Sequence, residues 1–232
     1  MSTDYYTAKR KVERDLDLEE ENFIQPEEML EYFNEALREA EAEVLGIYED
    51  YLLDNAPLEL VLGQAKYDLP EGIYSSKIRA IIYNSNNNII YEIKRIRGAK
   101  KFLDRALIIS ADPTDYYQYI MLNNATNGIQ IELSPPSKED STENVTVWFL
   151  RTVTPILINE DIVDKDIPES INFLYAFVKG KCKQKENGGV MPQDAQAEID
   201  QQRKLLIETL TNMVPDDDNE VIKDLSIYQE MS

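Results

Sequence analysis

A continuous hydrophobic stripe in residues 26–54 predicts a long helix near the start of the chain. Gln25-Pro26-Glu27-Glu28 opens it, because proline is tolerated in the first turn and glutamates suit the positive end of the helix dipole. The stripe recurs at alternating steps of three and four over three heptads: Leu30, Phe33, Leu37, Ala40, Val44, Ile47 and Tyr51. The stripe packs against the core of its own domain or, alternatively, forms a seam with a neighbouring copy of the chain. The interaction residues of that seam would be Leu30, Phe33, Leu37 and Val44.

Residues 57–153 alternate short apolar runs with turn signals, which predicts a β region. Gly63 permits a tight turn after the first run, Pro70 ends pairing, and the polar residues 84–88 form a reversal. The expected strand segments are residues 58–62, 76–83, 89–96, 116–122, 129–133 and 144–153. In the last of them, Trp148 lies on the face opposite to Val145, Val147 and Phe149. We expect an antiparallel sheet of about five to seven strands, or a small sandwich.

The helical pattern returns in residues 168–213 as a predicted pair of helices. The first opens at Ile167-Pro168-Glu169, ends in four lysines that suit the negative end of a helix, and stops at Asn187-Gly188-Gly189. The second extends from about Pro192 to Met213. The residues expected to face the core are Ile171, Leu174, Tyr175 and Val178, then Ala195, Ile199, Leu206 and Leu210. Together these patterns predict the α+β class: a long N-terminal helix, a central antiparallel β-sheet or small sandwich, and a C-terminal helical pair with an extended tail.

The two ends differ from the predicted domain at residues 25–213. Residues 1–24 mix charge with little apolar content, which is typical of a mobile N-terminal arm. The alternative is an arm that orders on a partner through Tyr5, Tyr6, Leu16 and Leu18. Residues 214–232 begin with an acidic linker at 214–219 and continue with a set of apolar side chains, which indicates either a docking tail or a fraying last helix. Those side chains are Val221, Ile222, Leu225, Ile227 and Tyr228.

Composition narrows the functional classes. The 232 residues carry a net charge of −20, which repels nucleic-acid phosphates and argues against a DNA-reading module. The chain has no histidine, so it lacks the commonest general base and transition-metal ligand. Its single cysteine, Cys182, cannot form an intramolecular disulfide. The first thirty residues lack a signal-peptide core and no apolar run reaches 18 residues, so we expect neither export nor a membrane span.

Three features resemble reactive sites only superficially. Asp161, Asp164 and Asp166 have a calcium-loop composition but lack its glycine and terminal glutamate. Cys182 lies between lysines, which would lower its pKa, yet a buried and inert thiol is the favoured interpretation. Gly188-Gly189 is not followed by the Lys-Ser/Thr pair of a phosphate-binding loop. We therefore expect no catalytic residue, no cofactor and no metal.

The order of the parts resembles the head-to-tail adaptor, or connector, proteins of tailed bacteriophages, particularly those with short tails. The most specific pieces are Gly63-Gln64-x-x-Tyr67-x-Leu69-Pro70 and Ile131-x-Leu133-x-Pro135-Pro136. The helix at residues 30–37, Tyr91 to Ile96, Val145 to Arg151 and Asp166-Ile167-Pro168-Glu169 follow in the same order. The resemblance covers about residues 25–213 and omits both ends.

This resemblance implies a structural virion protein at the head–tail junction, assembled in the host cytoplasm. Such adaptors form rings, commonly of twelve subunits, between the portal and the downstream tail or nozzle protein. DNA passes through the ring during ejection without specific binding, and the acidic charge agrees with that. The alternatives are a virion-associated hydrolase with two catalytic carboxylates and a transient assembly factor.

Overall fold

The protein is of the α+β class and consists of two compact units. The computed structural model describes residues 2–18, 23–84, 90–100, 102–103, 116–124 and 128–213. A helical unit comprises Met1–Tyr51 and Val153–Ser232, and a β unit comprises Leu52–Thr152. The β unit is thus an insertion in the sequence of the helical unit. The predicted reversal at residues 85–88 and the predicted tail at residues 214–232 lie outside the described residues.

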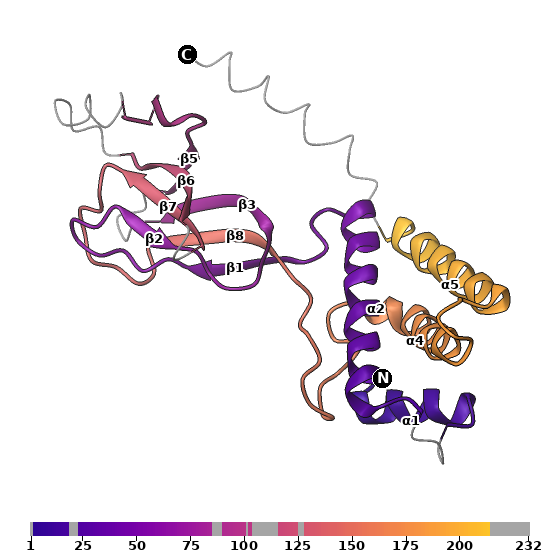
Figure 1. Ribbon diagram of the computed structural model, residues 1–232. Helices are drawn as coiled ribbons and strands as arrows, with labels where there is room; N and C mark the ends of the chain where they lie inside the picture. Colours follow the sequence, from indigo (N-terminus) through magenta and orange to yellow (C-terminus); the bar gives the residue numbers. More distant parts are fainter. Residues whose placement is uncertain are drawn as a thin grey trace. The chain divides into compact units, whose positions relative to one another are not determined.

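The helical unit is built on α2, Pro26–Ile47, against which α4, Ile171–Glu186, and α5, Gln193–Thr211, pack (Figure 1). A short 3₁₀ turn, η1, Pro168–Ser170, precedes α4. The eight core-facing positions predicted for the C-terminal pair are buried except Ile171, which is half-buried. Asn187 ends α4, and Gly188 and Gly189 follow with φ values of 66° and 94°, which glycine adopts easily. The C-terminal helical pair is therefore as predicted.

A helix occupies the segment that was predicted to be a mobile arm. Helix α1 spans Tyr5–Asp15 and packs on α4, and the Asp4 carboxylate caps its first turn by accepting from the Thr7 N–H at 2.7 Å. Tyr5, Ala8 and Val12 are buried at helical spacing. The prediction of a mobile arm was wrong because tertiary packing of these three buried side chains stabilises the helix, although the segment is rich in charge.

Helix α2 ends earlier than the predicted residue 54. It stops at Ile47, one residue after Gly46, and a turn at Tyr48–Tyr51 follows. The Tyr51 hydroxyl, predicted to continue the stripe, instead donates to Glu169 Oε2 at 2.7 Å. The next residues enter the β unit as strand β1, Leu53–Pro57, which pairs with β8, Val145–Arg151.

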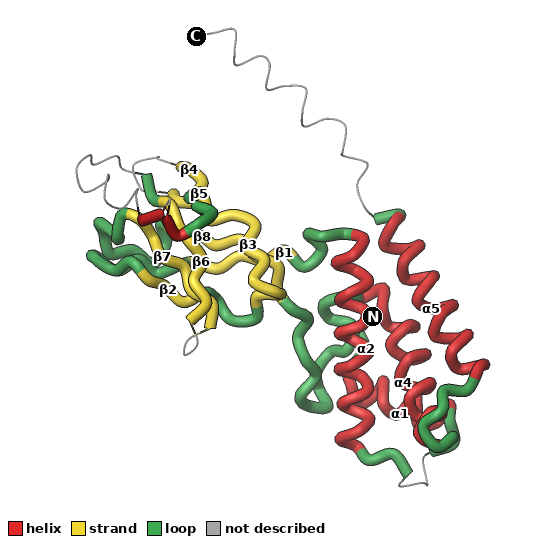
Figure 2. The backbone as a smooth tube through the Cα atoms, turned by 45° about the horizontal axis from the view of Figure 1, so that its top comes forward, coloured by secondary structure: helices red, strands yellow, loops and turns green. Residues whose placement is uncertain are grey.

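Two four-stranded sheets form the β unit (Figure 2). The first has the order β1-β8-β3-β4, with β8 at Val145–Arg151, β3 at Ile73–Asn84 and β4 at Ile90–Glu92. The second has the order β2-β7-β6-β5, with β2 at Lys66–Asp68, β7 at Gly128–Ser134, β6 at Gln118–Asn124 and β5 at Lys94–Arg95.

The two sheets share one hydrophobic core, so the small sandwich is the correct alternative. Ile81, Val147 and Phe149 of the first sheet pack in one cluster with Ile131 and Leu133 of the second. Trp148 is 36% exposed on the opposite face of β8, as its alternation predicted. The sandwich is not wholly antiparallel, because β5 pairs with β6 in parallel.

One predicted strand is replaced by an irregular connection. In residues 58–62 only Leu60 forms a β-bridge, to Ser141, and Gly63 turns the chain with φ 79°. Leu58 and Leu60 are buried, whereas Leu62 is 62% exposed. The predicted strand at residues 58–62 is therefore wrong, because the adjacent residues 53–57 form the strand that pairs with β8.

Candidate interaction surfaces

The predicted seam residues of α2 belong mainly to the core of the helical unit. Phe33 and Val44 have no exposed surface, Leu37 is 3% exposed, and Leu30 is half-buried. The Phe33 ring makes an edge-to-face contact with Tyr5 of α1, with centroids 5.5 Å apart. Phe33, Leu37 and Val44 therefore pack in the core of their own unit, as the first of the two interpretations expected. The predicted tail contacts Val221, Ile222, Leu225, Ile227 and Tyr228 lie outside the described residues.

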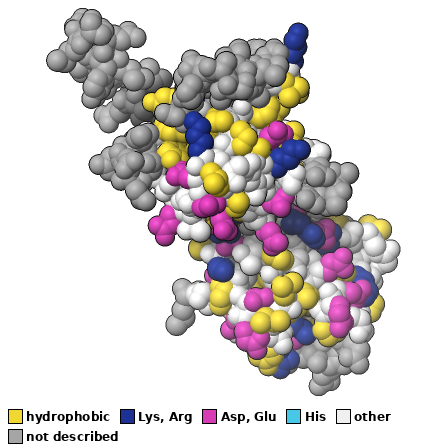
Figure 3. All heavy atoms as spheres, turned by 90° about the vertical axis from the view of Figure 1, so that its left-hand side faces the viewer, with side chains coloured by type: hydrophobic (Ala, Val, Ile, Leu, Met, Phe, Trp, Pro, Cys, Tyr) yellow, Lys and Arg dark blue, Asp and Glu magenta, His cyan; other side chains and the backbone are white. Residues whose placement is uncertain are grey.

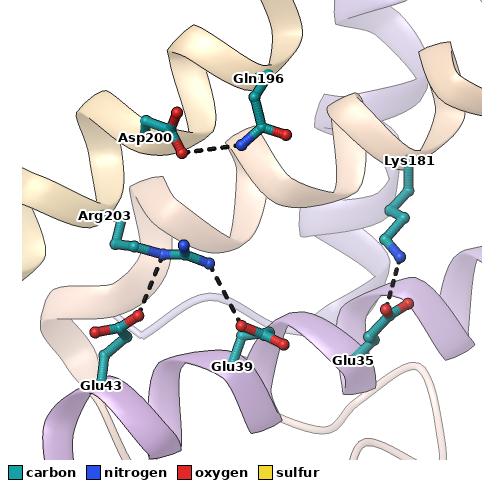
Figure 4. Close-up of polar contacts among 7 residues, drawn as sticks. All are labelled: Glu35, Glu39, Glu43, Lys181, Gln196, Asp200 and Arg203. Carbon is teal, nitrogen blue, oxygen red and sulfur yellow. Dashed lines mark hydrogen bonds and ion pairs between the residues drawn. The ribbon is translucent and has the colours of Figure 1, made fainter. Parts of the chain in front are cut away.

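Ion pairs fix α4 and α5 on α2 (Figure 4). Lys181 Nζ lies 2.6 Å from Glu35, and the Arg203 guanidinium bridges Glu39 and Glu43 at 3.4 Å and 3.3 Å. Lys185 binds Glu28, and the lysine hydrogen bond is the main cause that lowers the pKa of that carboxyl. The sequence predicted only a helix-dipole role for the lysines, because their carboxylate partners are distant in the chain.

A polar framework presents an apolar turn at residues 156–161. Asn34 holds the buried Ile156 twice: its side-chain amide donates to Ile156 O at 3.0 Å, and its carbonyl accepts from Ile156 N at 2.8 Å. The next two residues, Leu157 and Ile158, are 72% and 58% exposed. Tyr6, 55% exposed, donates its backbone N–H to Asn159 O at 3.0 Å. Three large apolar side chains thus project from a hydrogen-bonded support, as at protein contact sites.

The three aspartates with calcium-loop composition each bind a different backbone segment. Asp161 Oδ2 accepts from the N–H groups of Leu157 and Ile158 at 2.7 and 3.0 Å, which lowers the pKa of Asp161. Asp164 accepts from Thr3 N, and Asp166 accepts from Thr154 N. Within the described residues no group of three potential ligands converges on a metal position. These carboxylates organise the loop that carries the apolar turn.

The β unit carries a basic segment, defined as Lys94, Arg95, Arg97 and Lys100. All four side chains are exposed, and Lys94 and Arg95 form β5, the outer strand of the second sheet. None of them forms an ion pair with another described residue. Nearby, the exposed Tyr116 ring contacts Tyr91 edge-to-face, with centroids 4.8 Å apart. Two further cations that are close in sequence, Lys101 and Arg105, lie outside the described residues.

The edge of the first sheet at β1 is protected against strand addition. Arg151 N donates to Leu52 O and Leu58 N to Val145 O, so alternate residues of β1 direct their backbone groups away from β8. On that free side, the Asp54 carboxylate accepts from Asn55 N at 2.7 Å, and Pro57 has no N–H. Edge pairing of a second chain here would find few open donors.

An open cavity of about 470 Å³ lies in the β unit between residues 59–61 and residues 140–144. Its carboxylates are Glu59, Asp140 and Glu143, and Asp140 accepts from Leu62 N at 2.7 Å. Acidic side chains are spread widely over the face drawn in Figure 3. The cavity lining contains three carboxylates and no cation, and none of its features marks a binding site.

Four carboxyl groups of the described residues have pKa shifts opposite in direction to that of a general acid. Burial raises the pKa of the Cys182 thiol to about 12, and the prediction of a buried cysteine is confirmed, whereas the inertness of the thiol stays a prediction. The pKa values of Asp4, Glu28, Asp161 and Asp194 are all lowered by hydrogen bonds to the carboxylates. A general acid needs a shift in the other direction.

Comparison with known proteins identifies one family. The model of the family described as SU10 adaptor protein matches residues 3–220, which covers the β unit and, in the helical unit, all but residues 1–2 and 221–232. No curated protein matches the chain. Within the described residues, no helix combines the length and apolar content that crossing a membrane requires.

Proposed function

The chain belongs to the SU10 adaptor protein family of phage structural proteins, and we propose that it joins the portal to the tail in a virion. In this proposal identical subunits, with twelve as the expected number, form a ring at the head–tail junction. DNA leaves the head through the ring, and the downstream neighbour is a tail or nozzle protein. The family match over residues 3–220 is the observation that carries the proposal. A virion of the short-tailed type remains a prediction.

Surfaces for such a role are present in the helical unit. The turn with Leu157 and Ile158 keeps two large apolar side chains exposed on a support anchored by Asn34 and Asp161. Contact residues that are ordered before binding favour affinity, because ordering them on contact would cost free energy. We assign this turn to the contact with a neighbouring virion protein.

The C-terminal tail is the second proposed contact. Residues 214–219 contain three consecutive aspartates, and five apolar side chains follow at Val221, Ile222, Leu225, Ile227 and Tyr228. Burial of each contributes about 1–2 kcal/mol, which offsets only part of the cost of ordering a dozen residues. The affinity per copy is therefore low, and repetition around a ring supplies the remainder through avidity.

The charge agrees with a conduit that does not hold DNA. A protein with a net charge of −20 has little attraction for phosphates, even at low salt where counterion release favours binding most. We expect weak duplex binding in a gel shift at low salt. Tight binding at moderate salt would contradict passive passage.

Complementation of a phage that lacks the gene tests the proposal. Without the protein, DNA-filled heads should accumulate without tails, and the full-length chain should restore virions that contain the protein between portal and tail. Leu157→Asp should fold but fail to retain tails. Val190→Asp is the matched control, because Val190 is 65% exposed in the same unit and lies in the connection between α4 and α5. Normal virions without the protein at the junction would refute the role.

Deletion of residues 215–232 tests the tail separately. The truncated chain should remain folded and soluble but should be lost from DNA-filled heads during purification. Co-purification equal to that of the full-length chain would show that the tail does not dock.

A further inference from the structure

The formal charge of the chain is divided unequally between its two units. The helical unit contains 13 Lys and Arg against 32 Asp and Glu, a net charge of −19. The β unit contains 11 against 12, a net charge of −1. Almost the whole acidic surplus therefore belongs to one unit, whereas the other contains a local concentration of positive charge.

The two units also differ in how they use their cations. Among the described residues of the helical unit, the lysines and arginines that form ion pairs within the unit are Lys9, Arg10, Lys179, Lys181, Lys183, Lys185, Arg203 and Lys204. In the β unit, the four cations of the basic segment are exposed and form no ion pair with a described residue. Four like charges within seven residues repel one another, so an acidic partner would stabilise this arrangement.

We propose that the basic segment is a subunit contact that binds the acidic helical unit of a second copy of the chain. This inference rests on the proposed ring and specifies its interface. Such a contact joins two different surfaces and is heterologous, the type that generates closed rings when the rotation closes. The exposed Ile90 and Tyr116, close to the basic segment, supply the apolar part that a protein contact needs and that a phosphate backbone does not require.

The N-terminal half of α2 offers a matching acceptor. Glu27 and Glu31 are exposed and form no ion pair with a described residue, unlike Glu35, Glu39 and Glu43 farther along the same helix. Residues four apart on a helix lie about 6 Å from each other on one face.

The basic segment has a similar spacing. Ile96 N donates to Tyr119 O at 2.7 Å, so the extended pairing continues past β5. Arg95 and Arg97, two residues apart along an extended chain, are separated by about 7 Å. Two arginines can therefore meet two glutamates in register, and arginine is well suited to carboxylates because its guanidinium binds them in a bidentate manner.

Sedimentation velocity of the full-length chain, over a range of protein concentrations, tests this contact. The wild type should form species larger than a monomer, and raised salt should weaken them because exposed pairs are screened. Arg95→Glu with Arg97→Glu should weaken association by about tenfold or more, since two attractions become repulsions. Lys66→Glu is the matched control: Lys66 is exposed on β2, the outer strand at the other edge of the same sheet. It should associate as the wild type does.

A charge swap identifies the acceptor. Glu27→Lys with Glu31→Lys should also weaken association, and combining all four substitutions should restore it. Far-UV circular dichroism of every variant verifies that the fold is retained. Recovery in the fourfold variant is the result that a general loss of stability cannot produce.

Three outcomes would overturn the inference: association unchanged by the arginine substitutions, a wild type that stays monomeric at all concentrations, or an effect of the arginines on DNA retention alone. The last would assign the basic segment to nucleic acid. Failure of the proposed function is separate, because it is judged by whether the protein lies at the head–tail junction. A junction protein whose rings ignore these substitutions refutes only the interface.

Discussion

Replacement of Asn34 by alanine should loosen the turn that carries Leu157 and Ile158. The side chain makes two hydrogen bonds to the backbone of Ile156, at 2.8 and 3.0 Å, and Ile156 is 2% exposed. Each bond contributes about 0.5–1.5 kcal/mol, and the two backbone groups then lack partners in a place that water reaches poorly. The free energy of unfolding of the helical unit should fall by about 2–3 kcal/mol.

Urea unfolding followed by far-UV circular dichroism measures this loss. With an m value of about 2 kcal/mol/M, the midpoint should fall by about 1 M. Trp148 is the single tryptophan and lies in the β unit, so its fluorescence reports the other unit in the same samples. Asn34→Asp retains the acceptor for Ile156 N but loses the donor, and it should lie between alanine and the wild type. A fall of less than about 0.5 kcal/mol in the free energy of unfolding for Asn34→Ala would show that the two hydrogen bonds of Asn34 do not hold the turn.

Three further predictions concern the helical unit. Phe33→Asp should prevent this unit from folding, because burial of an unpaired carboxylate costs several kcal/mol. Glu31→Asp, at an exposed position of the same helix, is the control. Helical circular dichroism retained in the Phe33 variant would contradict the burial of this side chain. The Cys182 thiol should react with a thiol reagent near pH 8 only after unfolding, and rapid reaction of the native protein would show that it is accessible. The lowered pKa of Asp161 contributes stability that is present above the unfolded value of about 3.9 and lost as pH falls through the lower folded value. Asp161→Asn should therefore flatten the decline in stability below about pH 4, and an unchanged decline would exclude this carboxylate as its source.

Regular patterns in the sequence predicted the parts of the fold that depend on local periodicity. The alternation around Trp148 gave the correct faces of β8, and Ala195, Ile199, Leu206 and Leu210 are all buried in α5 as their spacing required. Both signals follow the geometry of one strand or one helix, so no knowledge of distant residues was needed.

Distant partners determined what the sequence could not predict. Helix α1 is stable because its backbone meets a loop far along the chain: Tyr5 N donates to Asp161 O, and Val163 N donates to Thr3 O. The turn with Leu157 and Ile158 was missed for the same reason, since its anchor, Asn34, lies 122 residues before Ile156. The sequence shows two adjacent apolar residues, Leu157 and Ile158, with Asp161 three residues later, but this pattern does not reveal that the two apolar side chains are exposed.

The four lysines of α4 show how a local rule can be right and incomplete. They lie toward the negative end of the helix, as predicted, but their spacing divides them between two neighbours. Lys179 and Lys183 pair with Glu198 and Asp194 of α5, while Lys181 and Lys185 pair with Glu35 and Glu28 of α2.

In each set, the lysine later in the sequence pairs with the carboxylate earlier in the sequence, so α4 is antiparallel to both α5 and α2. Helix α4 thus uses its positive charge to hold two acidic helices, and the cations of the helical unit are largely consumed within it. Its surplus carboxylates can then be neutralised only by ions or by a partner, and the basic segment of the β unit is the complementary surface that the same chain provides.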